Sequence, residues 1–133
     1  MNLLLDTHIW LWSHLEPERL GRRLGETMRD EESRLWLSPI SVWEFFLLSE
    51  RGRLALAGKT TPADWLDAAM SRSPMRDAAL TREVAVRSRS VQLAHADPAD
   101  RFLAATADVY ELTLVTADER LLRGKGYRTL GNR

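Results

Sequence analysis

The sequence predicts an α/β protein in which helices cover both faces of a central, mostly parallel sheet, giving three α/β/α layers. Short apolar stretches of strand length alternate with longer helical stretches, and this alternation favours parallel strands joined by helical crossovers. The 133 residues are 44% hydrophobic, enough for one sizeable core. No repeat, linker or low-complexity stretch is visible, so we expect a single domain over residues 1–133.

The first half of the chain supplies two expected strands and three expected helices. Leu3–Leu5 and Leu35–Leu37 are apolar runs of strand length. The helices are expected over His8–Leu15, Glu18–Met28 and Ser41–Glu50. In the second of these helices, apolar residues recur every fourth position, which is the buried face of an amphipathic helix.

Proline marks the start of two helices in the second half of the chain. Thr61-Pro62 and Asp97-Pro98 each place Pro at the first helical position, where its missing N–H is no loss. A weak stretch around Met75–Leu80 leads to a helix expected near Arg82–Val91. The remaining elements are the clearest strand, Leu112–Thr116, a short helix, Glu119–Leu122, a Gly-Lys-Gly turn and a final strand, Tyr127–Leu130.

Composition restricts the function classes. The chain carries 19 basic and 19 acidic residues, so any contact with nucleic acid must rest on a local patch of charge. The absence of cysteine excludes disulfides and Cys-ligated zinc. No apolar run approaches the ~18 residues of a membrane helix and no targeting segment is visible, so we expect a cytoplasmic protein with no membrane contact.

Four carboxylates are expected at one edge of the sheet. Asp6 follows the first strand, and Glu44 lies about one helical turn beyond the second. Asp118 lies two residues past the LTLVT strand, and Asp100 opens a helix. Because ligands bind beyond the carboxyl ends of parallel strands, these side chains can meet there. Clustered carboxylates repel one another unless a cation such as Mg²⁺ neutralises them, so the pattern predicts a nuclease site with a metal-activated water.

Each of these acids has an alternative role at a helix start. Ser41-Val42-Trp43-Glu44 matches the S-x-x-E capping box. Asp97-Pro98-Ala99-Asp100 offers an N-cap followed by an acid in the first turn, and Asp6 and Asp118 also precede helices. Thr61-Pro62-Ala63-Asp64 repeats the Pro-Ala-Asp arrangement where no chemistry is expected, so it serves as an internal control.

Four stretches give a more specific match. LLLDTHIWLW, SPISVWEF, HADPADRFLAATA and LTLVTADERL, in this order and at this spacing, resemble the PIN-domain ribonucleases. Among these they most resemble the VapC-type toxins of bacterial toxin–antitoxin pairs, over nearly the whole chain. The resemblance implies a PIN-like fold and an endoribonuclease that hydrolyses RNA with Mg²⁺ or Mn²⁺.

The resemblance also implies which residues form the site. The family's four acids fall on Asp6, Glu44, Asp100 and Asp118, which we expect to bind the metal and carry catalysis. Four secondary candidates are Asp97, Thr116, Arg101 and Thr7. Asp97 ranks below Asp100 because Asp100 occupies the family's D-x-x-L-A-A position. Thr116 is expected to orient a water or a carboxylate, and Arg101 to contact phosphate or pair with an acid, whereas His95 is expected to be an ordinary loop residue.

Five tryptophans are more than a small core easily hides. Trp10 and Trp12 are two apart, so on a helix they are not expected to face the same core. An exposed apolar patch usually marks a partner surface. Besides RNA, the resemblance supplies two partners, a cognate antitoxin and a second copy of the chain in a homodimer.

Three other interpretations stay open. A PIN nuclease of RNA processing needs no antitoxin, and a short antitoxin gene beside this one would distinguish the two. A receiver or aspartyl-phosphatase domain requires paired acids at the first strand and a late lysine, whereas Lys59 and Lys125 are poorly placed. A binding module whose acids are all caps predicts no effect of metal on stability.

Overall fold

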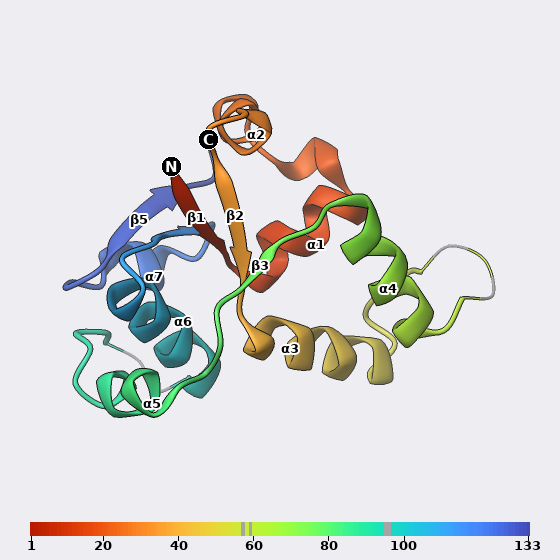
Figure 1. Ribbon diagram of the computed structural model, residues 1–133. Helices are drawn as coiled ribbons and strands as arrows, with labels where there is room; N and C mark the ends of the chain where they lie inside the picture. Colours follow the sequence, from red (N-terminus) through yellow and green to blue (C-terminus); the bar gives the residue numbers. More distant parts are fainter. Residues whose placement is uncertain (57, 59, 95–96) are drawn as a thin grey trace.

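Five strands form one sheet in which each neighbouring pair is parallel, in the order β3-β2-β1-β4-β5 (Figure 1). The strands are β1 (Asn2–Leu5), β2 (Arg34–Leu37), β3 (Arg76–Asp77), β4 (Thr113–Thr116) and β5 (Arg128–Gly131). The computed structural model describes residues 1–56, 58, 60–94 and 97–133, so Lys59 and His95 lie outside the described residues. The predicted α/β fold with a parallel sheet is confirmed.

Helices cover both faces of this sheet. They are α1 (Thr7–Leu15), the 3-10 helix η1 (Pro17–Arg19), α2 (Arg22–Arg29), α3 (Pro39–Glu50), α4 (Pro62–Arg72), α5 (Arg82–Ser88), α6 (Pro98–Val109) and α7 (Glu119–Arg123). Figure 1 shows α1, α3 and α4 to one side of the sheet and α5, α6 and α7 to the other. Within the described ranges, no helix has the length and apolar character needed to cross a membrane.

The central strand β1 is buried on both faces. Leu3 and Leu5 pack into one hydrophobic cluster, on the side of α1 and α3, and Leu4 packs into a second cluster on the side of α6. All three leucines are fully buried, and burial of one leucine stabilises a fold by about 1.5–3 kcal/mol. This packing on both faces holds β1 in place within the sheet, and therefore fixes the position of Asp6, which follows directly after the strand.

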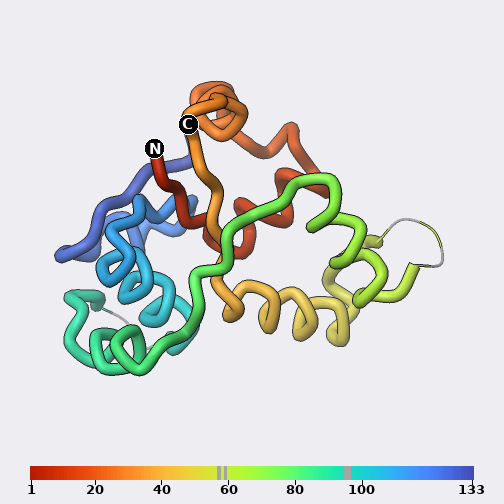
Figure 2. Tube along the Cα trace, viewed as in Figure 1, coloured from red at the N-terminus to blue at the C-terminus, as the bar shows by residue number. Residues whose placement is uncertain are grey.

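The order in which strands are added to the sheet reverses at β1. It adds β2 and β3 on one side, then passes through α5 and α6 to add β4 and β5 on the other side (Figure 2). The carboxyl ends of β1 and β4 therefore flank a switch in strand order, the place where open parallel sheets bind ligands.

The helix expected over Glu18–Met28 is wrong as a single element. The chain forms η1 and α2 with an interruption at Gly21, whose N–H donates to Asn132 Oδ1 at 2.7 Å. A Cβ on Gly21 would lie 1.8 Å from the carbonyl carbon of Arg133, so the C-terminal tail passes directly against this glycine. A contact with the far end of the chain thus overrides the local apolar period.

Three other elements differ from expectation by more than one residue. Helix α3 begins at Pro39 rather than at Ser41, because the Ser38 hydroxyl caps it by accepting a hydrogen bond from the Ile40 N–H at 3.1 Å. The stretch Met75–Leu80 contains the short strand β3, which its weak apolar pattern did not predict. Helix α5 ends at Ser88, three residues earlier than expected.

The tryptophans divide between core and surface. Trp10 is fully buried and packs edge-on against Phe45 and Trp65, with ring centroids 5.9 and 6.0 Å away. Trp12 is half-buried against the same cluster, contrary to the expectation that it faces elsewhere. Trp43 is 54% exposed, so the core leaves this aromatic side chain at the surface.

Candidate active site

A pocket of about 370 Å³ lies at the carboxyl edge of the sheet. Five of its lining residues are carboxylates: Asp6, Glu44, Asp97, Asp100 and Asp118. The described remainder of the lining is His8, Trp12, Ala117 and Arg120. The structure therefore brings together all four expected primary acids and Asp97, from segments that span more than a hundred residues of sequence.

Asp6 is held by the sheet and by the helix that follows it. Its N–H donates to Val115 O at 2.9 Å, which extends the β1–β4 pairing by one residue. One carboxylate oxygen accepts from the Thr7 N–H at 2.7 Å as the N-cap of α1, and the other accepts from the Thr116 hydroxyl at 2.7 Å. The side chain is buried, and burial raises the pKa of Asp6 although the Thr116 hydrogen bond opposes this.

Thr116 links two of the acids. Its fully buried hydroxyl donates to Asp6 and accepts from the Asp118 N–H at 3.0 Å. Asp118 in turn caps α7 by accepting from the Arg120 N–H at 2.8 Å. Burial raises the pKa of Asp118, but the hydrogen bonds and charge of Arg120 outweigh burial, and the pKa lies below its usual value. One hydroxyl thus fixes both sides of the crevice between β1 and β4.

Glu44 reaches the pocket from the second turn of α3. Its Oε1 accepts from the Thr7 hydroxyl at 2.6 Å, and that hydroxyl also shares a 2.9 Å hydrogen bond with Ser41 Oγ. The capping-box interpretation of Glu44 is wrong, because α3 starts before Ser41 and the cap is Ser38. Burial raises the pKa of Glu44, while the Thr7 hydrogen bond lowers it. Thr7 therefore holds Glu44 as Thr116 holds Asp6.

Asp97 and Asp100 come from the start of α6. Asp97 is the N-cap, and its side chain accepts from the Asp100 N–H at 3.2 Å. Asp100 is half-buried, and its pKa is raised to about 7, first by burial and then by the negative charges of the other four acids. Burial and the four neighbouring acids thus both disfavour the charged form of Asp100.

The donor set fits a divalent cation. Five carboxylates face one permanent cation, Arg120, among the described residues that line the pocket. No three acidic or histidine side chains in the described part of the chain converge closely enough to hold a bare ion. The five carboxylates line a pocket of about 370 Å³, and Mg²⁺ usually keeps several of its waters and takes only one or two carboxylates directly.

Three residues near the site lie differently from what the sequence suggested. The guanidinium of Arg101 donates to the carbonyl oxygens of Ser88, Leu93 and Val91 at 2.8, 3.2 and 3.1 Å, so it fastens the loop after α5 to α6. His8 and Arg120 line the acidic pocket although the sequence suggested no role for either. The position of Arg120, two residues after Asp118, was the available signal.

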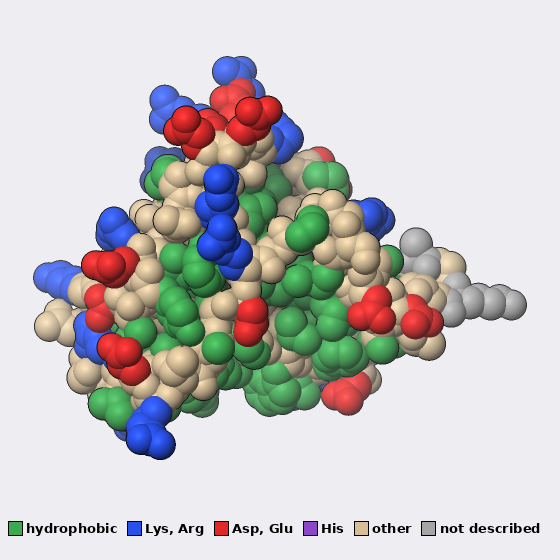
Figure 3. All heavy atoms as spheres, in the orientation of Figure 1, with side chains coloured by type: hydrophobic (Ala, Val, Ile, Leu, Met, Phe, Trp, Pro, Cys, Tyr) green, Lys and Arg blue, Asp and Glu red, His purple; other side chains and the backbone are tan. Residues whose placement is uncertain are grey.

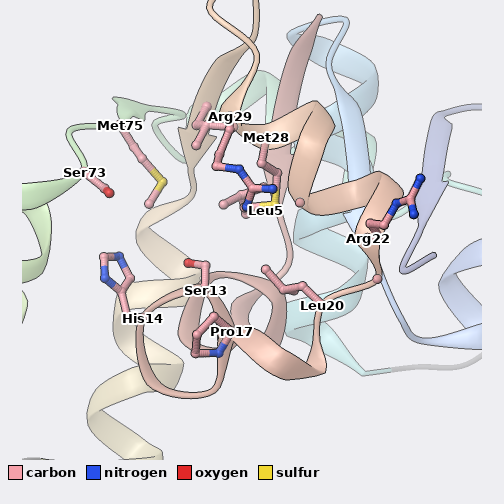
Figure 4. A pocket seen from close by; sticks show the side chains of 13 residues that line it. Leu5, Ser13, His14, Pro17, Leu20, Arg22, Met28, Arg29, Ser73 and Met75 are labelled. Atoms are coloured by element: carbon pink, nitrogen blue, oxygen red, sulfur yellow. The ribbon is translucent and has the colours of Figure 1, made fainter.

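A second cavity of about 420 Å³ lies between α1, α2 and the segment after α4 (Figure 4). None of its described lining residues is acidic, and two are arginines, Arg22 and Arg29. His14 reaches it, and its Nε2 is buried with no hydrogen-bond partner among the described residues. Burial lowers the pKa of His14, and the nearby charge of Arg72 lowers it further. This cavity lacks the oxygen ligands of the acidic pocket.

Comparisons with known proteins agree with the geometry. A family model described as the PIN domain matches residues 3–126. Ribonuclease VapC22 of Mycobacterium tuberculosis (strain ATCC 25618 / H37Rv) is 32% identical over 120 residues, which cover 90% of this chain and 88% of the relative.

Solved structures give the same fold. The structure of VapBC2 from Rickettsia felis bound to a DNA fragment from their promoter matches with a TM-score of 0.71 and 14% identity, over 98% of both chains. VapBC-5 of Mycobacterium tuberculosis, a member of the VapBC family of toxin–antitoxin systems, matches with a TM-score of 0.59 and 17% identity, over 99% of this chain and 98% of the other.

Proposed function

This chain belongs to the PIN-domain family, and from that premise we propose that it is a VapC-type toxin that hydrolyses RNA phosphodiester bonds with a divalent cation, Mg²⁺ or Mn²⁺. The observation that carries the proposal is the pocket of five carboxylates at the switch in strand order. The ribonuclease relative, 32% identical over most of both chains, supports the same activity.

The residues divide into ligands and positioning groups. Asp6, Glu44 and Asp100 would hold the cation, and Asp118 would bind it directly or through water. Thr116 and Thr7 keep Asp6 and Glu44 in place through hydrogen bonds of 2.7 and 2.6 Å. A bound divalent cation acidifies water and stabilises charge on phosphate oxygens. The protein's part is to present fixed oxygen ligands at one point of the RNA backbone.

The proposal includes protein partners. The structures matched by this fold include members of a toxin–antitoxin family, which supports a cognate antitoxin. Figure 3 shows hydrophobic side chains gathered over α3 and α4. On α3, Trp43 is 54% exposed and Phe46 is half-buried, and on α4, Leu66 and Met70 are half-buried. We assign this apolar face to partner contacts, with the antitoxin or with a second copy of the chain, and light scattering of the purified protein reports the second case.

RNA cleavage by the purified protein tests the activity. We expect cleavage in Mg²⁺, loss of cleavage in EDTA, and recovery when Mg²⁺ is added back. Glu44→Gln should abolish cleavage, because the amide is a poorer ligand than the carboxylate. Glu50→Gln is the matched control, since Glu50 is an exposed residue at the end of the same helix. Cleavage that persisted after complete metal removal would disprove the proposal.

A further inference from the structure

A basic pocket adjoins the acidic one. It has a volume of about 270 Å³, and its described lining residues are Gln92, Ala94, Arg120, Arg123, Gly124 and Lys125. Three of these residues are cations and none is acidic. Arg120 lines both pockets, so the two are neighbours that share one side chain as a wall.

The backbone around the basic pocket is fixed by contacts between distant segments. The Lys125 N–H donates to Gln92 O at 2.9 Å, which ties the turn after α7 to the segment after α5. The Tyr127 hydroxyl donates to Leu121 O at 2.6 Å and closes the turn from the other side. A Cβ on Gly124 would lie 1.9 Å from that hydroxyl, so any larger residue here would displace the Tyr127 side chain. Arg123 and Lys125 therefore project from a preset turn.

The chain as a whole does not attract RNA, because its formal charge is zero. The acidic pocket by itself repels a phosphate backbone. A polyanion that must reach five carboxylates needs cations next to them, and guanidinium groups are well suited to phosphate. The basic pocket supplies such cations directly beside the acidic one, on the side of Arg120.

We propose that Arg123 and Lys125, with Arg120, form a binding subsite for a backbone phosphate of the RNA strand next to the scissile one. This inference rests on the proposed function, since it assumes that the strand crosses the acidic pocket. The subsite reads phosphate rather than base, because its charged groups are suited to phosphate oxygens and no aromatic ring is among its described lining residues.

Arg120 lies between the two pockets and lines both of them. Its guanidinium pairs with the Asp118 carboxylate at 3.3 and 3.4 Å, longer than the 2.7–2.9 Å of a strong charge-assisted hydrogen bond. The side chain is 55% exposed, so the pairing with Asp118 is open to solvent. When a cation neutralises the acids, Arg120 is free to turn from Asp118 to phosphate.

The chain contains a matched control for the subsite. Arg51-Gly52-Arg53 lies just after α3, and Arg123-Gly124-Lys125 begins at the last residue of α7. Each segment places two exposed cations around a glycine. Neither Arg51 nor Arg53 lines the acidic or the basic pocket. The double variants Arg123→Ala/Lys125→Ala and Arg51→Ala/Arg53→Ala therefore remove the same charge from exposed positions at the ends of two helices.

The test measures binding of a fluorescent single-stranded RNA in EDTA by anisotropy, from about 50 to about 200 mM salt. We expect Arg123→Ala/Lys125→Ala to weaken binding about tenfold and to reduce the salt slope by about 1.4, the value for two lost phosphate contacts with a single strand. The Arg51→Ala/Arg53→Ala variant should bind as the unaltered protein does. In Mg²⁺, the first variant should raise KM with kcat nearly unchanged.

Each contrary result is decisive. Equal weakening in both variants would reduce the effect to overall charge and overturn the subsite, and so would unchanged binding in the first variant or no RNA binding at all. Failure of the proposed function would look different, since the unaltered protein would then not cleave RNA in Mg²⁺ while the binding comparison still gave its answer.

Discussion

Two helices of this protein begin with nearly the same four residues, and only one of them begins in the candidate site. Thr61-Pro62-Ala63-Asp64 opens α4, and Asp97-Pro98-Ala99-Asp100 opens α6. In each, the first side chain accepts a hydrogen bond of 3.2 Å from the backbone N–H of the fourth residue. Asp64 is exposed, whereas Asp100 is half-buried among four other acids and has a pKa raised to about 7.

The difference lies in the topology and not in the local sequence. Helix α6 precedes β4, so its first turn lies at the carboxyl edge of the sheet beside the ends of β1 and β4 (Figure 1). Helix α4 precedes the edge strand β3 and begins away from that edge. The same four-residue start therefore serves only as a cap in one place, and as a cap plus a charged ligand in the other.

The largest expected effect is on catalysis. Asp100→Asn should reduce RNA cleavage by more than the about 10- to 100-fold that loss of an outer positioning group costs, because it removes a proposed metal ligand. Asp64→Asn should leave cleavage unchanged. Initial rates in saturating Mg²⁺ measure both. Equal activity of the two variants would remove Asp100 from the mechanism and give its role to Asp97.

A smaller loss of activity is expected from Thr116→Val. The variant keeps the shape of the side chain but deletes the hydroxyl that donates to Asp6 and accepts from Asp118. Cleavage should fall about 10- to 100-fold. Thr106→Val is the control, since Thr106 is also fully buried but donates to a carbonyl within α6. Thr116→Ser should recover most of the activity, and if it did not, the role assigned to the hydroxyl would be wrong.

The raised pKa of Asp100 predicts a gain in stability when its charge is removed. In EDTA, the folded protein keeps a proton on Asp100 up to about pH 7, while the unfolded chain releases it near 3.8. The folded state thus binds more protons between these values, and the free energy of unfolding falls as pH rises through this window. In Asp100→Asn, the side chain does not titrate, so the free energy of unfolding does not fall for this reason.

The variant should therefore be more stable than the unaltered protein at pH 8, by about 1–2 kcal/mol after allowing for the half-exposed position, and nearly equal to it at pH 4. Urea unfolding in EDTA at the two pH values measures the difference, with Asp64→Asn as control. Greater stability at pH 8 together with lost cleavage would show that the site is built at a cost to the fold. A variant less stable than the unaltered protein at pH 8 would contradict the electrostatic argument.

The sequence predicted features that depend on short-range rules, and missed those set by distant contacts. The caps at Asp6, Asp97 and Asp118 are confirmed, because each depends only on the next one to three residues. The break at Gly21 depends on the C-terminal tail, and local periodicity contains no trace of it.

Glu44 shows why the site was harder to predict than the fold. Two serines three residues apart competed to start α3, and the one before proline caps it. Its contact with Thr7 joins helices that begin at the ends of different strands, so only the assembled sheet reveals it. Arg120 was missed although its pairing with Asp118, two residues earlier, is local, because only the assembled structure shows that both side chains line the pocket.

The smallest expected effect is on stability, and it concerns the N-caps of α4 and α6. Thr61→Ala and Asp97→Ala each delete an N-cap hydrogen bond, which costs about 1 kcal/mol of stability. Asp97→Ala also removes a negative charge that raises the pKa of Asp100, so part of its cost is recovered. In EDTA at pH 8 and low salt, Asp97→Ala should therefore destabilise the protein less than Thr61→Ala. Added salt should shrink the difference, because screening weakens the repulsion between Asp97 and Asp100. If the difference were instead independent of salt, it would reflect the geometry of the two caps and not the acidic pocket.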